Sequence, residues 1–230
     1  MVKSFIGENP DFTNEQKEQQ LEKFEKALEL ALEIHSDQKP RPDGPYVNHI
    51  LRVSTRIVEE YGIKDLELVI AALLHDSVED QSEKLANLAI NDKKISKREK
   101  ALLFINDNFG ERVKNTVFKL TNLEYEDKNI SQDQKNKVYL EHVKEAIEDP
   151  DVLPIKLADF SDNALNLESV KEIEKRLKLS NKYLPVMEVF IERLERSQNI
   201  FSQEKIIEMK NNLVFAVENT KDFINNQEKK

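Results

Sequence analysis

The 230-residue chain has no cysteine and no tryptophan, and only four glycines and seven prolines. Without cysteine there can be no disulfide and no thiolate-bound zinc, so a bound metal would need His, Asp, Glu or Asn ligands. Few glycines and prolines, together with abundant Leu, Glu and Lys, favour long helices over a turn-rich β architecture. No apolar run approaches the roughly 18 residues of a membrane span, and residues 1–9 do not resemble a secretory signal. We therefore expect a cytoplasmic protein with no membrane partner.

The charge balance bears on the class of ligand. The formal net charge is −9, with 34% charged and 39% hydrophobic residues. A nucleic-acid-binding surface normally needs a basic excess, so we expect no nucleic-acid partner. An anionic small molecule stays possible, because a divalent cation or a local basic cluster can reverse the field inside a cleft.

Apolar residues at helical spacing predict one all-α domain of about eight to ten helices. A proline-rich segment at 39–45 and the Phe109-Gly110 pair interrupt this pattern. The predicted helices cover 14–34, 46–61, 65–79, a short segment after 82, a segment after Ser96, a segment after Gly110, 131–147, 152–167, 169–198 and 203–225.

In residues 69–80, ionisable side chains occur in a segment whose apolar pattern predicts that it is buried. An almost wholly apolar stretch is followed by His75-Asp76 and then by Glu79-Asp80. On a continuous helix, positions four apart would place these side chains on one surface. Burying several ionisable groups is costly unless they are paired or bound to a metal. The alternative is a helix that simply ends at His75-Asp76, with Glu79 and Asp80 in solvent.

Two further segments carry the same anomaly. In 154–167, Asp159, Asn163 and Asn166 share one face of an otherwise apolar predicted helix, although such residues also form caps and turns. His49 opens a helix directly after the proline-rich segment. Two His with two Asp are a ligand set suited to a divalent cation with open positions for water.

In these segments the chain resembles the HD-domain phosphohydrolases, specifically the RelA/SpoT-type and small alarmone hydrolases. His-x-x-Gln lies at 35–38, the arginine loop at 41–44 and Pro-Tyr-x-x-His at 45–49. The block Ala-Ala-Leu-Leu-His-Asp-x-x-Glu-Asp occupies 71–80, and Lys-Leu-Ala-Asp with its later Asn is 156–163. The motifs occur in order over roughly 21–190.

The resemblance implies an HD-type helical bundle at 13–200, with an N-terminal extension at 1–12, a packed C-terminal helix at 201–225 and a frayed tail at 226–230. It implies one divalent metal ion, expected to be Mn²⁺, held by His49, His75, Asp76 and Asp159. Glu79 and Asp80 would orient and deprotonate a water that removes the 3′-pyrophosphate of ppGpp or pppGpp. The implied substrate-side residues are Lys39, Arg41, Tyr46, Asn163 and Asn166. The oligomeric state, monomer or homodimer, stays open.

The chain departs from the family pattern on the substrate side. Pro40 and Pro42 flank Arg41, and Phe160-Ser161-Asp162 stands where the family has a cation soon after its metal-binding Asp. A second candidate is therefore an HD nucleotidase or phosphodiesterase acting on another nucleotide or phosphate ester. A third is a helical regulatory protein with a vestigial site, against which the retained Glu79-Asp80 pair argues.

Overall fold

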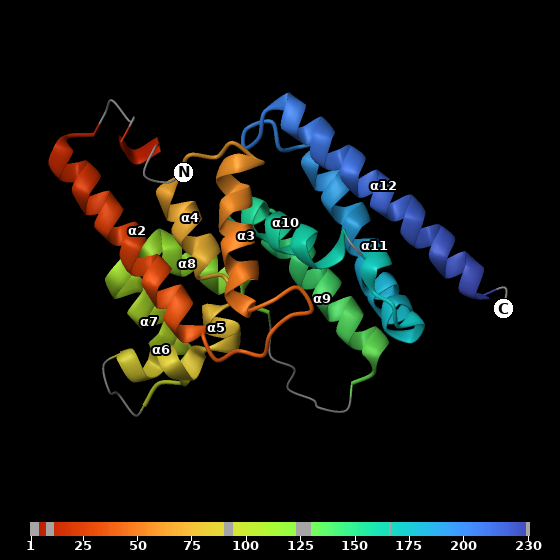
Figure 1. The fold of residues 1–230 in the computed structure, drawn as a ribbon, viewed down its shortest axis with the longest axis horizontal. Coiled ribbons are helices and arrows are strands. Elements are labelled where there is room, and N and C mark those ends of the chain that lie inside the picture. Colours follow the sequence, from red (N-terminus) through yellow and green to blue (C-terminus); the bar gives the residue numbers. More distant parts are fainter. Residues whose placement is uncertain (1–4, 8–11, 90–93, 123–129, 166, 229–230) are drawn as a thin grey trace. The chain divides into compact units, whose positions relative to one another are not determined.

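The computed structural model describes residues 5–7, 12–89, 94–122, 130–165 and 167–228. The predicted all-α class is confirmed, and the described residues contain no β-strand. The helices, labelled in Figure 1, are α2 (Asn14–Ile34), α3 (Tyr46–Glu59), α4 (Leu66–Leu73), α5 (Ser77–Asp80), α6 (Ser82–Leu88), α7 (Lys97–Phe109), α8 (Glu111–Leu120), α9 (Gln132–Ala146), α10 (Val152–Ala164), the 3₁₀ helix η1 (Leu167–Ser169), α11 (Ile173–Leu194) and α12 (Gln203–Glu228).

Helix starts and ends follow local side-chain chemistry. Thr13, Ser96 and Ser131 each cap a helix in a capping box, which satisfies backbone N–H groups that a helix start leaves without partners. Asp65 accepts hydrogen bonds from two backbone N–H groups at the start of α4. Gly110 joins α7 to α8 with φ of +96°, a conformation that residues with a Cβ rarely adopt.

The chain divides into two compact units, residues 1–122 and 123–230. In the first unit α4 packs against α2, α3 and α8, and Figure 1 shows it between α2 and α3. Seven of its eight residues, all except Glu67, are buried. Because α4 is apolar on nearly every side, it forms the centre of this unit. Its end therefore places His75 in the interior, with the partly exposed Asp76 next to it.

The prediction of a single helix over 65–79 is wrong, and the extra break helps raise the number of helices among the described residues above the eight to ten expected. The chain leaves α4 at Leu74 and resumes a helix only at Ser77. Within this break Nδ1 of the His75 ring lies 2.8 Å from the Ala72 carbonyl oxygen. His75 and Asp76 are therefore presented by a turn between two helices and not by one helical face.

The second unit contains α9–α12. α11 packs against α9, α10 and α12, and Figure 1 shows α11 and α12 side by side. Phe160 of α10 is 2% exposed, and its ring centroid lies 5.0 Å from Phe190 and 5.5 Å from Tyr183. This aromatic cluster fixes the rotation of α10 about its axis. Asp159 therefore lies on a different side of the helix from the cluster. α12 continues to Glu228, through residues that the sequence assigned to a frayed tail.

No helix among the described residues is long and apolar enough to cross a membrane.

Candidate metal centre

Three predicted ligands meet in the first unit. The Nε2 atoms of His49 and His75 lie 3.6 and 3.1 Å from the same Asp76 oxygen, Oδ2. Both histidines are buried, at 1% and 3% exposure, and their rings meet edge to face with centroids 5.3 Å apart. His49 comes from the first turn of α3, while His75 and Asp76 come from the turn after α4. The structure thus brings these three predicted ligands together.

The hydrogen bonding of His75 fits a metal ligand. A backbone carbonyl oxygen can only accept, so the contact between His75 Nδ1 and Ala72 O places the proton on Nδ1. In the neutral ring the lone pair is then on Nε2, which faces the Asp76 carboxylate. A lone pair and a carboxylate oxygen at 3.1 Å repel each other unless a proton or a cation lies between them. Fixing a ring through its other nitrogen is also the usual arrangement for metal-binding histidine.

Asp76 is held as a carboxylate. Burial opposes its ionisation, but His75 and His49 outweigh that effect and hold the pKa of Asp76 well below its ordinary value. Tyr46 donates its hydroxyl hydrogen to Asp76 Oδ2 at 2.5 Å. The Tyr46 ring also stacks on His35 and meets His49 edge to face. Tyr46, predicted on the substrate side, thus contacts the predicted ligand set directly.

Asp80 contacts both Tyr46 and a second hydrogen-bonded group of residues. Gln38 Nε2 donates to Asp80 Oδ2 at 2.7 Å, and Gln38 Oε1 lies 2.5 Å from His35 Nδ1 and 3.0 Å from Gln81 Nε2. Burial, and then the negative charge of Asp76, raise the pKa of the Asp80 carboxyl above its ordinary value. A carboxylate whose pKa is raised is a better proton acceptor than an ordinary aspartate.

Glu79 is not directed at the same partners as Asp80. Both of its carboxylate oxygens accept hydrogen bonds from the Asn122 side chain, at 3.1 and 2.9 Å, and Oε2 also accepts from the Asn122 backbone N–H at 3.0 Å. Glu79 is thus held by Asn122, while Asp80 is held by Gln38.

The arginine loop is compact. The backbones of Arg41 and Gly44 exchange hydrogen bonds of 2.9 and 3.1 Å, and Gly44 has φ of +129°. A Cβ at Gly44 would lie 2.9 Å from Asn48 Nδ2, so the Asn48 side chain would have to move, and the positive φ would in addition strain any residue with a side chain. Asp43 lies 3.8 Å from Arg41 Nε and 2.6 Å from Arg52. Lys39 is exposed beside this loop.

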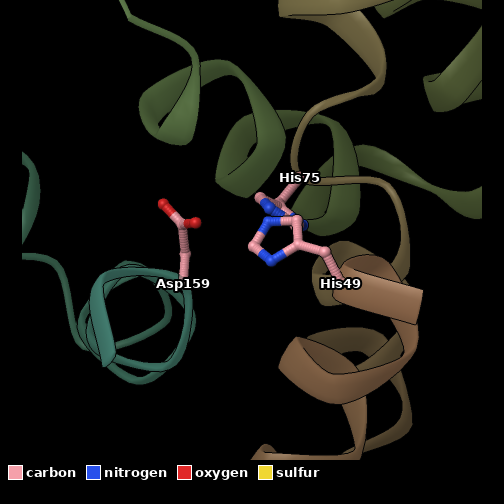
Figure 2. Close-up of side chains that lie close together, drawn as sticks. All are labelled: His49, His75 and Asp159. Carbon is pink, nitrogen blue, oxygen red and sulfur yellow. The ribbon is translucent and has the colours of Figure 1, made fainter. Parts of the chain in front are cut away.

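The other predicted residues belong to the second unit. Asp159 lies on α10 and accepts a hydrogen bond from Asn163 Nδ2 at 2.6 Å, one helical turn later. The predicted polar stripe is thus formed by these two residues, while Asn166 lies outside the described residues. Figure 2 draws Asp159 on α10, together with His49 and His75 of the first unit.

Two positioning residues had no predicted role. Gln38 belongs to the His-x-x-Gln motif, but its contact with Asp80 joins positions 42 residues apart. Asn122 follows Leu120-Thr121 and reaches Glu79 over 43 residues. The His-x-x-Gln motif could have indicated a role for Gln38, whereas no motif named above includes Asn122.

Comparison with known proteins assigns the class. A family model described as the HD domain matches residues 27–195, so the chain belongs to the HD-domain family and the predicted membership is confirmed. The matched residues include all four predicted metal ligands, His49, His75, Asp76 and Asp159.

Two curated relatives of the chain share the same name. A guanosine-3′,5′-bis(diphosphate) 3′-pyrophosphohydrolase of Aquifex aeolicus is 32% identical over 176 residues, 76% of this chain and 22% of the relative. The human protein of that name, MESH1, is 37% identical over 67 residues, 28% of this chain and 37% of the relative. The chain thus spans about a fifth to two fifths of these curated relatives.

A solved structure shares the fold. It belongs to a protein described as "a metazoan ortholog of SpoT" that "hydrolyzes ppGpp and plays a role in starvation responses". Its TM-score with this chain is 0.58 at 24% identity, covering 86% of this chain and 94% of that one. At this identity the likeness establishes the helical fold.

Proposed function

We propose that the chain is a metal-dependent hydrolase that releases pyrophosphate from the 3′ position of ppGpp or pppGpp, leaving GDP or GTP. The observation that carries the proposal is the convergence of His49, His75 and the Tyr46 hydroxyl on one oxygen of the partly buried Asp76 carboxylate. The names of the two curated relatives support the choice of substrate.

The donor set favours one divalent ion held by His49, His75 and Asp76, with Asp159 of the second unit as a further ligand. His49, His75 and Asp159 are all donor types that such an ion takes. Two imidazole nitrogens and two carboxylates suit Mn²⁺, which we propose as the physiological metal. Such an ion supplies Lewis-acid polarisation of a phosphate oxygen and lowers the pKa of a bound water.

The protein's own residues would handle the protons. As the water oxygen bonds to the phosphorus attached to the 3′ oxygen, a water proton passes to Asp80, which Gln38 orients. The bond between that phosphorus and the 3′ oxygen breaks, the 3′ oxygen takes up a proton, and pyrophosphate leaves. Glu79, held by the hydrogen bonds from Asn122, would help to orient the attacking water.

Substrate recognition falls to the loop before α3 and to α10. Arg41 and Lys39 would neutralise phosphate charge, and Arg41 can bind two phosphate oxygens at once. Tyr46 would act by holding Asp76 and by packing the loop. Asn163, which is hydrogen-bonded to Asp159, and Asn166 would contact the ribose or a phosphate of the substrate.

A second candidate is an HD nucleotidase or phosphodiesterase acting on another phosphate ester. The position that follows Asp159 is Phe160, and its side chain is buried against Phe190 and Tyr183. It therefore provides no cation to the substrate, although related hydrolases are expected to have one there. A smaller or less charged ester would need that cation least.

The test is to incubate the Mn²⁺-loaded full chain with ppGpp, pppGpp, dNTPs and cyclic dinucleotides while phosphate and pyrophosphate release are followed separately. Manganese-dependent pyrophosphate release from ppGpp and pppGpp alone is the expected result. Release from dNTPs or cyclic dinucleotides alone favours the second candidate. No turnover of any of them, with no metal found by elemental analysis, contradicts both.

A further inference from the structure

A cavity of about 180 Å³ lies within the second unit, between the end of α10, α11 and α12. Its walls are mixed. Leu167, Ala216 and the exposed ring of Phe215 supply apolar surface, while Arg176, Ser180 and Thr220 supply polar groups. None of these residues has a role in the proposed hydrolysis.

Two buried polar atoms of this cavity have no hydrogen-bond partner in the part of the chain that the structure describes. Ser180 is 1% exposed, and among the described residues its Oγ has no hydrogen-bond partner. The same holds for Nε of Arg176, whose guanidinium carbon lies 4.0 Å from the centre of the Phe223 ring. A buried hydroxyl or N–H without a partner normally costs free energy, so these two groups need acceptors from water or from a ligand in the cavity.

The cavity is separate from the predicted metal side of α10. At about 100° per residue, Asn163 lies roughly 40° around the helix from Asp159, whereas the cavity residue Ala164 lies roughly 140° away. The hydrogen bond between Asp159 and Asn163 confirms that those two share one side. A ligand in the cavity would therefore contact the opposite side of the helix that carries Asp159.

We propose that this cavity binds a small phosphate monoester. The Arg176 guanidinium supplies positive charge and a planar set of donors, and Ser180 and Thr220 supply hydroxyl groups from two helices. Donors arriving from different helices suit a tetrahedral group with several acceptor oxygens. Phe215 and Leu167 supply apolar contact for the organic part of the ester. Glu168 lines the cavity as well, but it is exposed at the rim.

The full chain is titrated with phenyl phosphate, and with phenol as the uncharged probe, by isothermal calorimetry and ligand-observed NMR. Saturable binding of phenyl phosphate is expected, with phenol bound at least about tenfold more weakly because a charge-assisted contact is missing. Arg176→Ala should weaken binding by about tenfold or more, and Lys175→Ala, an exposed neighbour, by less than about twofold. Glu168→Gln should strengthen binding, since it removes a negative charge from the rim.

Two further variants separate this site from the metal centre and from a structural effect. Asp76→Asn should leave the affinity for phenyl phosphate within about twofold of the unchanged protein, because Asp76 is not part of the cavity. Ser180→Ala should weaken binding severalfold without lowering the melting temperature, because the hydroxyl has no partner to lose. The proposal is overturned if phenyl phosphate shows no saturation, if Arg176→Ala binds as well as the unchanged protein, or if Asp76→Asn abolishes binding.

Discussion

Replacing Asp80 by asparagine tests the proposed proton acceptor. The variant keeps the size of the side chain, and its amide oxygen can still accept the 2.7 Å hydrogen bond from Gln38. It cannot take a proton from water, however. Loss of a positioned general base costs about a hundred- to ten-thousand-fold in rate, so kcat should fall by that factor while KM changes little. Elemental analysis should find the same metal content, because Asp80 is not among the proposed ligands.

The assay is pyrophosphate release from ppGpp at saturating Mn²⁺, with kcat and KM measured separately. Asp107→Asn removes an exposed carboxylate on α7 in the same unit and serves as the matched control, with kcat expected within about twofold. If Asp80→Asn kept more than about a third of the kcat, a general-base role for Asp80 would be refuted. A parallel loss of metal would instead place Asp80 among the ligands.

The same variant gives a pH-dependent stability prediction. Burial and Asp76 raise the pKa of Asp80 in the folded chain, so ionising it costs stability as pH rises from its ordinary value through its folded value. Above that window Asp80→Asn should melt at a higher temperature than the unchanged, metal-free protein. Below pH about 3, where both side chains are neutral, the difference should disappear. An equal difference at every pH would contradict the raised pKa.

The remaining predictions concern the ligands, the positioning residues and the core. His75→Ala should lose both bound metal and turnover, since it removes a buried ligand, and retained metal by elemental analysis would contradict the ligand set. Asn122→Ala should lower kcat by about tenfold or more with KM nearly unchanged, because Glu79 loses hydrogen bonds from the Asn122 side chain. An unchanged kcat would show that the contact between Asn122 and Glu79 is purely structural. Phe160→Ala should lower the free energy of unfolding by about 3–5 kcal/mol in urea, and a loss below about 1 kcal/mol would show that the aromatic cluster does not hold α10.

Most of the fold could be predicted because local chemistry determines it. The start of α2 at Thr13, of α4 at Asp65 and of α7 at Ser96 all follow from capping residues that are visible in the sequence. The sequence left the break at 74–76 open between a continuous helix and a helix that ends at His75-Asp76, because the segment contains neither glycine nor proline to decide between them. The break depends instead on burial of the turn and on the contact between His75 and the Ala72 carbonyl oxygen.

The candidate site likewise has residues that the sequence could identify and contacts that it could not. His49, His75 and Asp76 could be found because ionisable residues interrupt apolar segments, and burial of such groups requires compensation. The partners of Glu79 and Asp80 could not, because Asn122 and Gln38 reach them across more than forty residues of sequence. Spacing along a helix gives no information about such contacts, since they depend on how separate helices pack.

The most direct test of the central claim is product analysis after incubation of the Mn²⁺-loaded chain with ppGpp, using anion-exchange chromatography and a pyrophosphate assay. The proposed function predicts GDP and pyrophosphate in equal amounts, with turnover abolished by a chelator and restored by Mn²⁺. Unchanged ppGpp, or release of inorganic phosphate without pyrophosphate, would contradict it.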